Sequence, residues 1–159
     1  MNETGRFDHA RYTADDVADC LLNAMDAMSA MKLQKLVYYC QAWSLVWDER
    51  PLFDAPIEAW ENGPVIPDLF RKHRDQFIVF PHTFKGHPDR LDADARETIE
   101  AIIRYYGSHT AQWLSDLTHA EDPWKQACAR RNPEDNRKAI IDLASLHLYY
   151  SGLLPNELQ

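Results

Sequence analysis

The stretch Met31-Lys-Leu-Gln-Lys-Leu-Val-Tyr-Tyr-Cys-Gln-Ala-Trp-Ser-Leu-Val-Trp47 decides the fold of this chain. Its main stripe recurs at helical spacing through Leu33, Leu36, Val37, Cys40, Ser44 and Trp47, and Tyr38, Leu45 and Val46 widen it. A helix that is apolar over so much of its circumference is packed on several sides. We therefore predict a central helix from about Met31 to Asp48, which Pro51 ends.

Capping signals predict further helices on both sides of the central one. Thr13 and Asp16 form a capping-box pattern, and apolar positions then recur from Val17 to Met28. Downstream, helices are expected to begin at Pro67, at an Asp94 cap with Glu97, at Thr110, at Asp122-Pro123 and at Asn132-Pro133. The last of these should bury Ile140, Leu143, Ala144, His147 and Leu148, and end at Gly152 and Pro155.

Two short segments have β character. Ile57–Trp60 is followed by a turn signal at Glu61-Asn62-Gly63-Pro64, and a second strand is expected around Phe77–Phe80. The predicted fold is therefore mainly α, a compact single-domain bundle of five or six helices with at most a small two-stranded β patch. We divide the chain into an N-terminal extension (1–12), a helical domain (13–155) and a C-terminal tail (156–159).

Composition limits the classes of partner. The 159 residues contain 17 Lys and Arg against 25 Asp and Glu, a net charge of −8. Such a chain lacks the basic surface that binds phosphate backbones, so no direct nucleic-acid contact is expected. The acidity suits a basic protein partner or serves solubility alone. Five Trp, seven Tyr and six Phe supply either core or interface anchors, and the composition does not divide them.

The compartment signals agree with one another. The N-terminus has no apolar segment of the secretory type, and no apolar run approaches the ~20 residues that span a membrane. The three cysteines, Cys20, Cys40 and Cys128, have neither the even number of a disulfide framework nor a CxxC spacing. We predict a cytoplasmic protein that has no membrane partner.

Candidate chemistry centres on His119. This histidine precedes Glu121 and Asp122, so it could act as a general base beside a carboxylate or simply fix the loop through backbone carbonyls. His82 and His87 lack the spacing of zinc ligands. Motifs for a nucleophile or for phosphate binding are absent from the sequence. We therefore expect no catalytic residue, no metal and no cofactor.

Two stretches combine constrained turns with tryptophans. They are Trp60-Glu-Asn-Gly-Pro-Val65 and Leu114-Ser-Asp-Leu-Thr-His-Ala-Glu-Asp-Pro-Trp124. Either each Trp is buried and the turns only reverse the chain, or the two turns pack side by side and present a shaped surface. On the second interpretation the candidate partner-binding residues are Trp60, Asn62, Gly63, Pro64, Thr118, His119, Pro123 and Trp124.

Three blocks of the chain resemble the Panacea domain, a family that includes phage-associated GepA-like proteins and SocA-like antitoxins. The blocks are Met31–Tyr39, Trp60–Val65, and Leu114–His119 with Pro123-Trp124, and the resemblance spans roughly residues 13 to 130. Any one block alone would be weak, but the three in this order are specific.

The resemblance implies a non-enzymatic antitoxin that neutralises a cognate protein toxin by direct binding. An alternative that it also implies is a proteolytic adaptor, which delivers its partner to a protease. The family supplies no catalytic residues, and the DNA-binding domain that some relatives carry is not expected here. A third hypothesis, from the residues alone, is a hydrolase that uses His119 with Glu121 or Asp122. The toxin's identity, the contact surface and the oligomeric state stay open.

Overall fold

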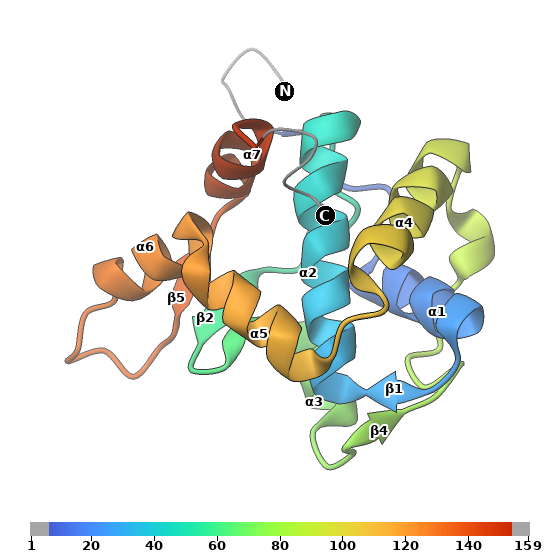
Figure 1. Ribbon diagram of the computed structural model, residues 1–159, viewed down its shortest axis with the longest axis horizontal. Coiled ribbons are helices and arrows are strands. Elements are labelled where there is room, and N and C mark those ends of the chain that lie inside the picture. The colour runs from blue at the N-terminus through green and yellow to red at the C-terminus, as the bar shows by residue number, and fades with distance from the viewer. Residues whose placement is uncertain (1–6, 154–159) are drawn as a thin grey trace.

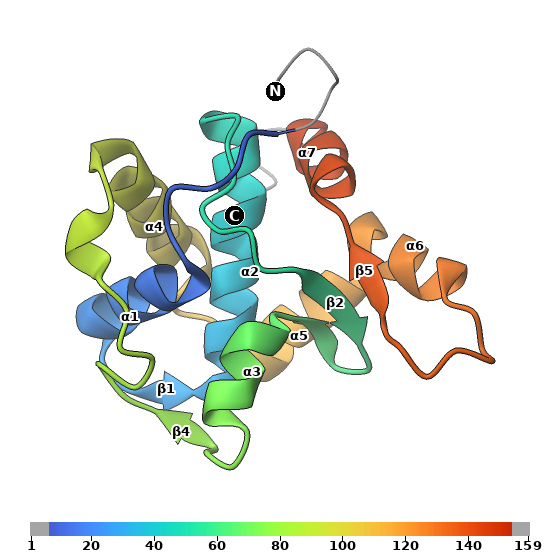
Figure 2. The same cartoon turned by 180° about the vertical axis from the view of Figure 1, so that it is seen from behind.

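Helix α2 (Ala30–Trp47) runs through the middle of the molecule, as Figures 1 and 2 show, and packs against α1, α4, α5 and α7. The computed structural model describes residues 7–153. The predicted central helix is thus confirmed, and its burial on several sides explains its apolar circumference. Part of the extension, residues 1–6, and the whole predicted tail, 156–159, lie outside the described residues, as does Pro155.

The described part of the chain is mainly α, but it holds more elements than expected. Its seven α-helices are α1 (Ala14–Met25), α2, α3 (Pro67–His73), α4 (Ala93–Tyr106), α5 (Ala111–Ala120), α6 (Asp122–Arg130) and α7 (Leu143–Ser151), with a 3₁₀ turn at Pro88–Arg90. Its strands form a two-stranded sheet, β1 (Met28–Ser29) with β4 (Ile78–Val79), and a three-stranded sheet in the order β3 (Gly63–Val65), β2 (Ile57–Trp60), β5 (Ala139–Ile141). The prediction of five or six helices and at most one two-stranded patch therefore underestimated the number of helices and strands.

Polar side chains of α2 hold the irregular segment between α2 and α3. Gln34 is buried and bonds both backbone groups of Ile66, accepting from the N–H at 2.8 Å and donating to the carbonyl at 3.2 Å. Gln41 accepts from the N–H of Leu52 at 2.7 Å and donates to the carbonyl of Phe53 at 2.8 Å. Buried backbone groups need partners, so these polar interruptions of the apolar run fix the path of residues 50–66.

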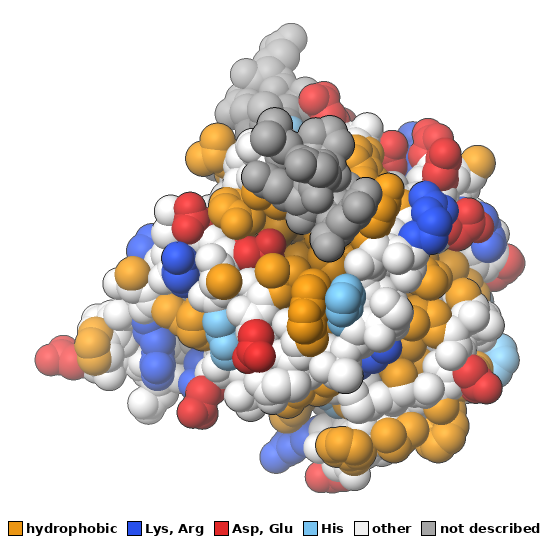
Figure 3. Space-filling model, in the orientation of Figure 1, with side chains coloured by type: hydrophobic (Ala, Val, Ile, Leu, Met, Phe, Trp, Pro, Cys, Tyr) orange, Lys and Arg blue, Asp and Glu red, His pale blue; other side chains and the backbone are white. Residues whose placement is uncertain are grey.

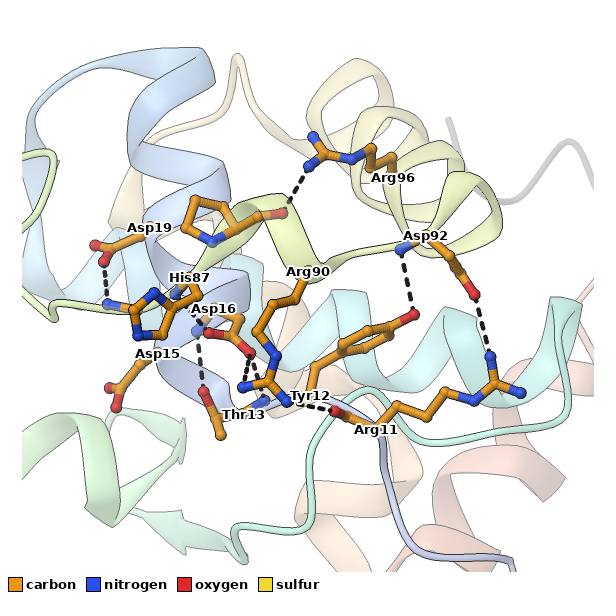
Figure 4. A network of polar contacts seen from close by, with 12 residues as sticks. Arg11, Tyr12, Thr13, Asp15, Asp16, Asp19, His87, Arg90, Asp92 and Arg96 are labelled. Carbon is orange, nitrogen blue, oxygen red and sulfur yellow. Dashed lines mark hydrogen bonds and ion pairs between the residues drawn. The ribbon is translucent and has the colours of Figure 1, made fainter.

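A second polar network holds the segment before α4 against α1 (Figure 4). The capping box of Thr13 and Asp16 is present, as predicted. The carboxylates of Asp16 and Asp19, both buried, each accept a backbone N–H at 2.6 Å, from His87 and Gly86 respectively. Residues far apart in sequence are thereby joined beside α1.

The cap of α4 is Asp92, and the prediction of Asp94 was wrong. The Asp92 carboxylate accepts from the N–H of Ala95 at 2.9 Å and from the guanidinium of Arg50 at 2.6 Å. The hydrogen bond from Arg50 holds the pKa of this carboxyl well below its usual range. Asp92 and Asp94 have similar local patterns for a helix cap. The ion pair with Arg50, which is 42 residues away in sequence, distinguishes Asp92 from Asp94.

The predicted start of the last helix at Asn132-Pro133 was also wrong. Residues 139–141 form β5, which pairs antiparallel with β2, and α7 begins only after the Asp142 cap. The late start changes which side of the helix is buried: Leu146 and Tyr150 face the core, whereas Leu148 is 79% exposed and Ile140 is 47% exposed. Gly152 ends the helix as predicted.

Smaller boundaries differ as well. α1 ends at Met25 because Asp26 has a φ of 68°, so Met28 belongs to β1 rather than to the helix. The Pro67 start, the Thr110 cap and the Gly107 end are confirmed.

An apolar edge formed by Phe77, Ile78 and Phe80 is exposed where β1 and β4 lie, at the lower right of Figure 3. None of the helices among residues 7–153 is long and apolar enough to cross a membrane.

Candidate partner-binding surface

The β2–β3 hairpin has a turn that only glycine accommodates. Trp60 pairs with Gly63 across the turn, and Ala59 pairs with Pro64. Gly63 has a φ of +120°, and a Cβ placed there would lie 2.7 Å from Cε of Lys35 and 2.8 Å from Oγ1 of Thr118. The hairpin backbone therefore rests directly on α2 and α5, which positions its tip.

The α5–α6 elbow is the second half of the surface. α5 ends at Ala120, Glu121 is the N-cap of α6, and the buried Pro123 lies in the first turn of α6. Helix α6 thus begins at Asp122, one residue earlier than the predicted cap at Asp122 would give. Thr118 Oγ1 donates to the carbonyl of Ser115 at 2.7 Å within α5, so its hydroxyl is used inside the elbow.

Three side chains of the elbow bond three successive carbonyls of the hairpin. Ser115 Oγ donates to Asn62 O at 2.6 Å, and His119 Nε2 donates to Glu61 O at 2.9 Å. The third donor, Trp124 Nε1, lies 2.8 Å from the carbonyl oxygen of Trp60. The two turns therefore pack side by side.

We call this assembly the hairpin–elbow surface, defined by the solvent-accessible residues Trp60, Glu61, Asn62, His119 and Trp124. The Trp60 ring is half-buried and meets Phe70 edge-on at 4.8 Å. The rings of His119 and Trp124 lie 4.2 Å apart. Aromatic side chains held in one orientation are typical of residues that anchor a binding partner.

The eight residues predicted for partner binding divide into two groups. Trp60, Asn62, His119 and Trp124 are half-buried or exposed and belong to the hairpin–elbow surface. The other four are buried and support that surface from beneath: Gly63, Pro64, Thr118 and Pro123. Packing thus accounts for the second group, while the first is available for contact.

Lys35 lies directly under the hairpin and was not singled out by the sequence. Its side chain is 1% exposed. Burial lowers the pKa of the Lys35 ammonium to about 8. The signal was present in the sequence as a charged residue within the apolar run of the central helix, but spacing alone does not say whether such a lysine is buried.

Glu121 is also buried, and its carboxylate is held by tyrosines. Oε1 accepts from Tyr39 OH at 2.7 Å and from Tyr150 OH at 2.8 Å, which joins α2, α6 and α7. Burial raises the pKa of Glu121 to about 7. His119 instead points to the hairpin, and within residues 7–153 no hydrogen bond or ion pair joins it to Glu121 or Asp122. The geometry therefore does not assemble the pair that the hydrolase hypothesis required.

Sequence comparisons bear on what such a surface is for. The family model described as antitoxin SocA-like, Panacea domain, matches residues 33–125. The chain belongs to this family. The Panacea domain of this chain thus contains the β2–β3 hairpin, the α5–α6 elbow and most of α2, which are the three blocks on which the resemblance was based.

A curated relative supports the same assignment of the Panacea domain. Antitoxin SocA of Caulobacter vibrioides (strain NA1000 / CB15N) is 32% identical over 125 residues, which cover 68% of this chain and 66% of that protein. The match therefore spans a little under two thirds of the relative's length. No solved structure matches the chain.

Proposed function

We propose that this Panacea-domain chain is an antitoxin that neutralises a protein toxin by binding it directly at the hairpin–elbow surface. The observation that carries the proposal is the convergence of the three family blocks. Lys35 from the first block lies under Gly63 of the second, and Trp124 from the third bonds Trp60 of the second. Family membership supports the antitoxin role, and this convergence supports the choice of surface.

The chemistry of the surface fits protein recognition. Trp60 and Trp124 are half-buried, so their rings are fixed before any partner arrives, and little side-chain entropy is lost on binding. Glu61 and Asn62 are exposed beside them and supply a polar rim. Their backbone carbonyls are already bonded to α5, which keeps the tip rigid.

Growth rescue tests the proposal. The gene next to this one is expressed from an inducible promoter, alone and together with this chain, and growth is recorded. We expect growth arrest without the chain and recovery with it. The variant Trp60→Ala should lose the rescue, whereas Trp113→Ala should retain it, because Trp113 is an exposed tryptophan of α5 outside the surface. Absence of both rescue and complex formation would refute the antitoxin role.

The same cells separate occlusion from delivery to a protease. If the chain acts by occlusion, the half-life of the partner protein is the same with and without it, and activity is suppressed in a stable complex. A partner half-life that shortens only when the chain is present would instead establish the adaptor function.

A further inference from the structure

A pocket of about 340 Å³ opens beside the hairpin, between β2–β3, α2 and α3. Its walls are largely apolar and aromatic, formed by Met31, Trp60, Val65 and Phe70. The polar lining residues are Gln34, Lys35 and His73, the exposed Glu61 and Asn62 at the hairpin tip, and Lys138 from the loop before β5. Trp60 therefore belongs to both the pocket and the hairpin–elbow surface.

The polar wall residues of the pocket differ in what they bond. The amide of Gln34 is occupied by Ile66, and its nitrogen also lies 3.0 Å from Nε2 of His73. Since an amide nitrogen only donates, His73 Nε2 is the acceptor and the ring is neutral. Burial and the nearby Lys35 lower the pKa of His73, in agreement with that state.

Lys35 is the exception. The residue is 1% exposed, and no hydrogen bond or ion pair to its ammonium is found among residues 7–153. Within that range its Nζ is not among the fully buried atoms that lack a partner, so the ammonium keeps contact with the open pocket. A buried charge without a partner is unfavourable, because desolvation is not offset by attraction. An anion that enters the pocket would supply the missing opposite charge.

We propose that the pocket receives a carboxylate borne by an apolar segment of the bound protein, with Lys35 as its counter-ion. The inference rests on the proposed antitoxin function and names the chemistry that the partner must bring. The carboxylate comes either from an Asp or Glu side chain or from the chain terminus of the partner.

Charge and shape favour a carboxylate over a phosphate group. The lining carries the buried ammonium of Lys35, the exposed ammonium of Lys138 and the exposed carboxylate of Glu61, and the resulting single positive charge balances a monoanion. Phosphate sites instead use several converging donors, such as a helix N-terminus or an Arg cluster. The apolar walls of Met31, Trp60 and Phe70 suit the hydrocarbon part of a peptide segment.

The first test measures the dissociation constant of the complex with the purified product of the adjacent gene. Lys35→Met removes the charge at similar length. We expect binding to weaken at least tenfold, while thermal stability stays unchanged or rises because an unpaired buried charge is gone. Binding equal to that of the wild type would overturn the inference and leave the antitoxin function standing. Absence of a complex with the wild-type chain would overturn the proposed function and this inference with it.

A second variant does not depend on tolerance of a change in the core. Met31→Glu places a carboxylate at the pocket wall on a residue that is 37% exposed and lies in the first turn of α2, where a negative charge suits the helix. We expect at least tenfold weaker binding from repulsion. Leu148→Glu, at an exposed position of α7, is the matched control. It makes the same change of charge outside the pocket and should bind as the wild type does. Equal affinities for the two variants would refute the inference.

Changes in the partner identify the source of the carboxylate. The Asp and Glu residues of the partner are converted one at a time to Asn and Gln. If a side chain enters the pocket, one of these changes should weaken binding as much as Lys35→Met does. Extension of its C-terminus by one alanine should do so if the terminal carboxylate enters. If neither set weakens binding, no carboxylate enters the pocket and the inference is wrong.

Discussion

The indole nitrogen of Trp124 donates a hydrogen bond of 2.8 Å to the carbonyl oxygen of Trp60, 64 residues earlier in the chain. The bond joins the first turn of α6 to the end of β2 and orients the Trp124 ring. The Trp60 ring is held separately, by its indole N–H, which donates to Glu58 at 2.8 Å, and by Phe70, which it meets edge-on. Neither tryptophan is fully buried, so part of each side chain packs and part is accessible to a partner. A structural and a binding role are therefore combined in the same side chains.

Removal of that bond should loosen the hairpin without unfolding the domain. Trp124→Phe keeps an aromatic ring but leaves the Trp60 carbonyl without its donor, and we expect a loss of about 1 kcal/mol in the free energy of unfolding. Urea denaturation followed by circular dichroism measures it. Trp113→Phe, at an exposed position of α5, is the control and should change the free energy of unfolding by less than about 0.5 kcal/mol. Equal effects of the two changes would contradict the role given to the bond.

Gly63 should tolerate no side chain. At φ +120° a Cβ would lie 2.7 Å from Lys35 and 2.8 Å from Thr118, so Gly63→Ala combines backbone strain with a clash. We expect a loss of at least about 2 kcal/mol of stability, together with loss of neutralisation.

Gly152→Ala is the control for this change. Its nearest contact would be 3.4 Å and its φ is −81°. Stability should stay the same or rise by less than about 1 kcal/mol. Similar losses at both glycines, again measured by denaturation, would show that the hairpin is less constrained than its geometry implies.

The buried Glu121 should make stability depend on pH. Its pKa is raised from 4.5 to about 7 in the folded chain. Between these values the folded state holds a proton that the unfolded state has released, so the free energy of unfolding falls as pH rises through this window, by up to about 3 kcal/mol.

Glu121→Gln removes that contribution and retains an oxygen that accepts from Tyr39 and Tyr150. Denaturation of the wild type and the variant between pH 4.5 and 7.5 measures the difference. We expect the free energy of unfolding of the variant, relative to that of the wild type, to increase with pH. If the two free energies change with pH in parallel, Glu121 does not titrate in this range.

The polar residues of α2 should be essential to the segment that they hold. Gln41→Leu leaves the N–H of Leu52 and the carbonyl of Phe53 without partners in the core, and we expect a loss of at least about 2 kcal/mol. Gln126→Leu, at an exposed position of α6, should change stability by less than about 0.5 kcal/mol. A small effect at Gln41 would mean that the segment 50–66 is fixed by other contacts.

Local signals in the sequence were sufficient for the central helix, the capping box at Thr13, the strand and turn at 57–64 and the helix start at Thr110. Each of these depends on residues within a few positions of one another. Local signals did not reveal β3, the return strand of the hairpin. The convergence of the two turn segments was also among the alternatives that the sequence allowed, because both carry tryptophans and constrained backbone.

The remainder depended on contacts distant in sequence. Asn132-Pro133 has the local pattern of a helix start, yet pairing of Ala139–Ile141 with β2 determines the structure there. The choice of Asp92 over Asp94 follows from Arg50. The burial of Lys35 and Glu121 follows from packing of the hairpin and of Tyr150, which no periodicity reveals.

The most direct test of the account is the dissociation constant of the complex between this chain and the product of the adjacent gene, compared for Trp60→Ala and Trp113→Ala. Trp60 lies on the hairpin–elbow surface, whereas Trp113 is a tryptophan of α5 that is 41% exposed outside it. The account predicts at least tenfold weaker binding for Trp60→Ala, a loss of ~1.4 kcal/mol or more, with the fold retained by circular dichroism. For Trp113→Ala it predicts binding within twofold of the wild type. Equal binding by the two variants would contradict it.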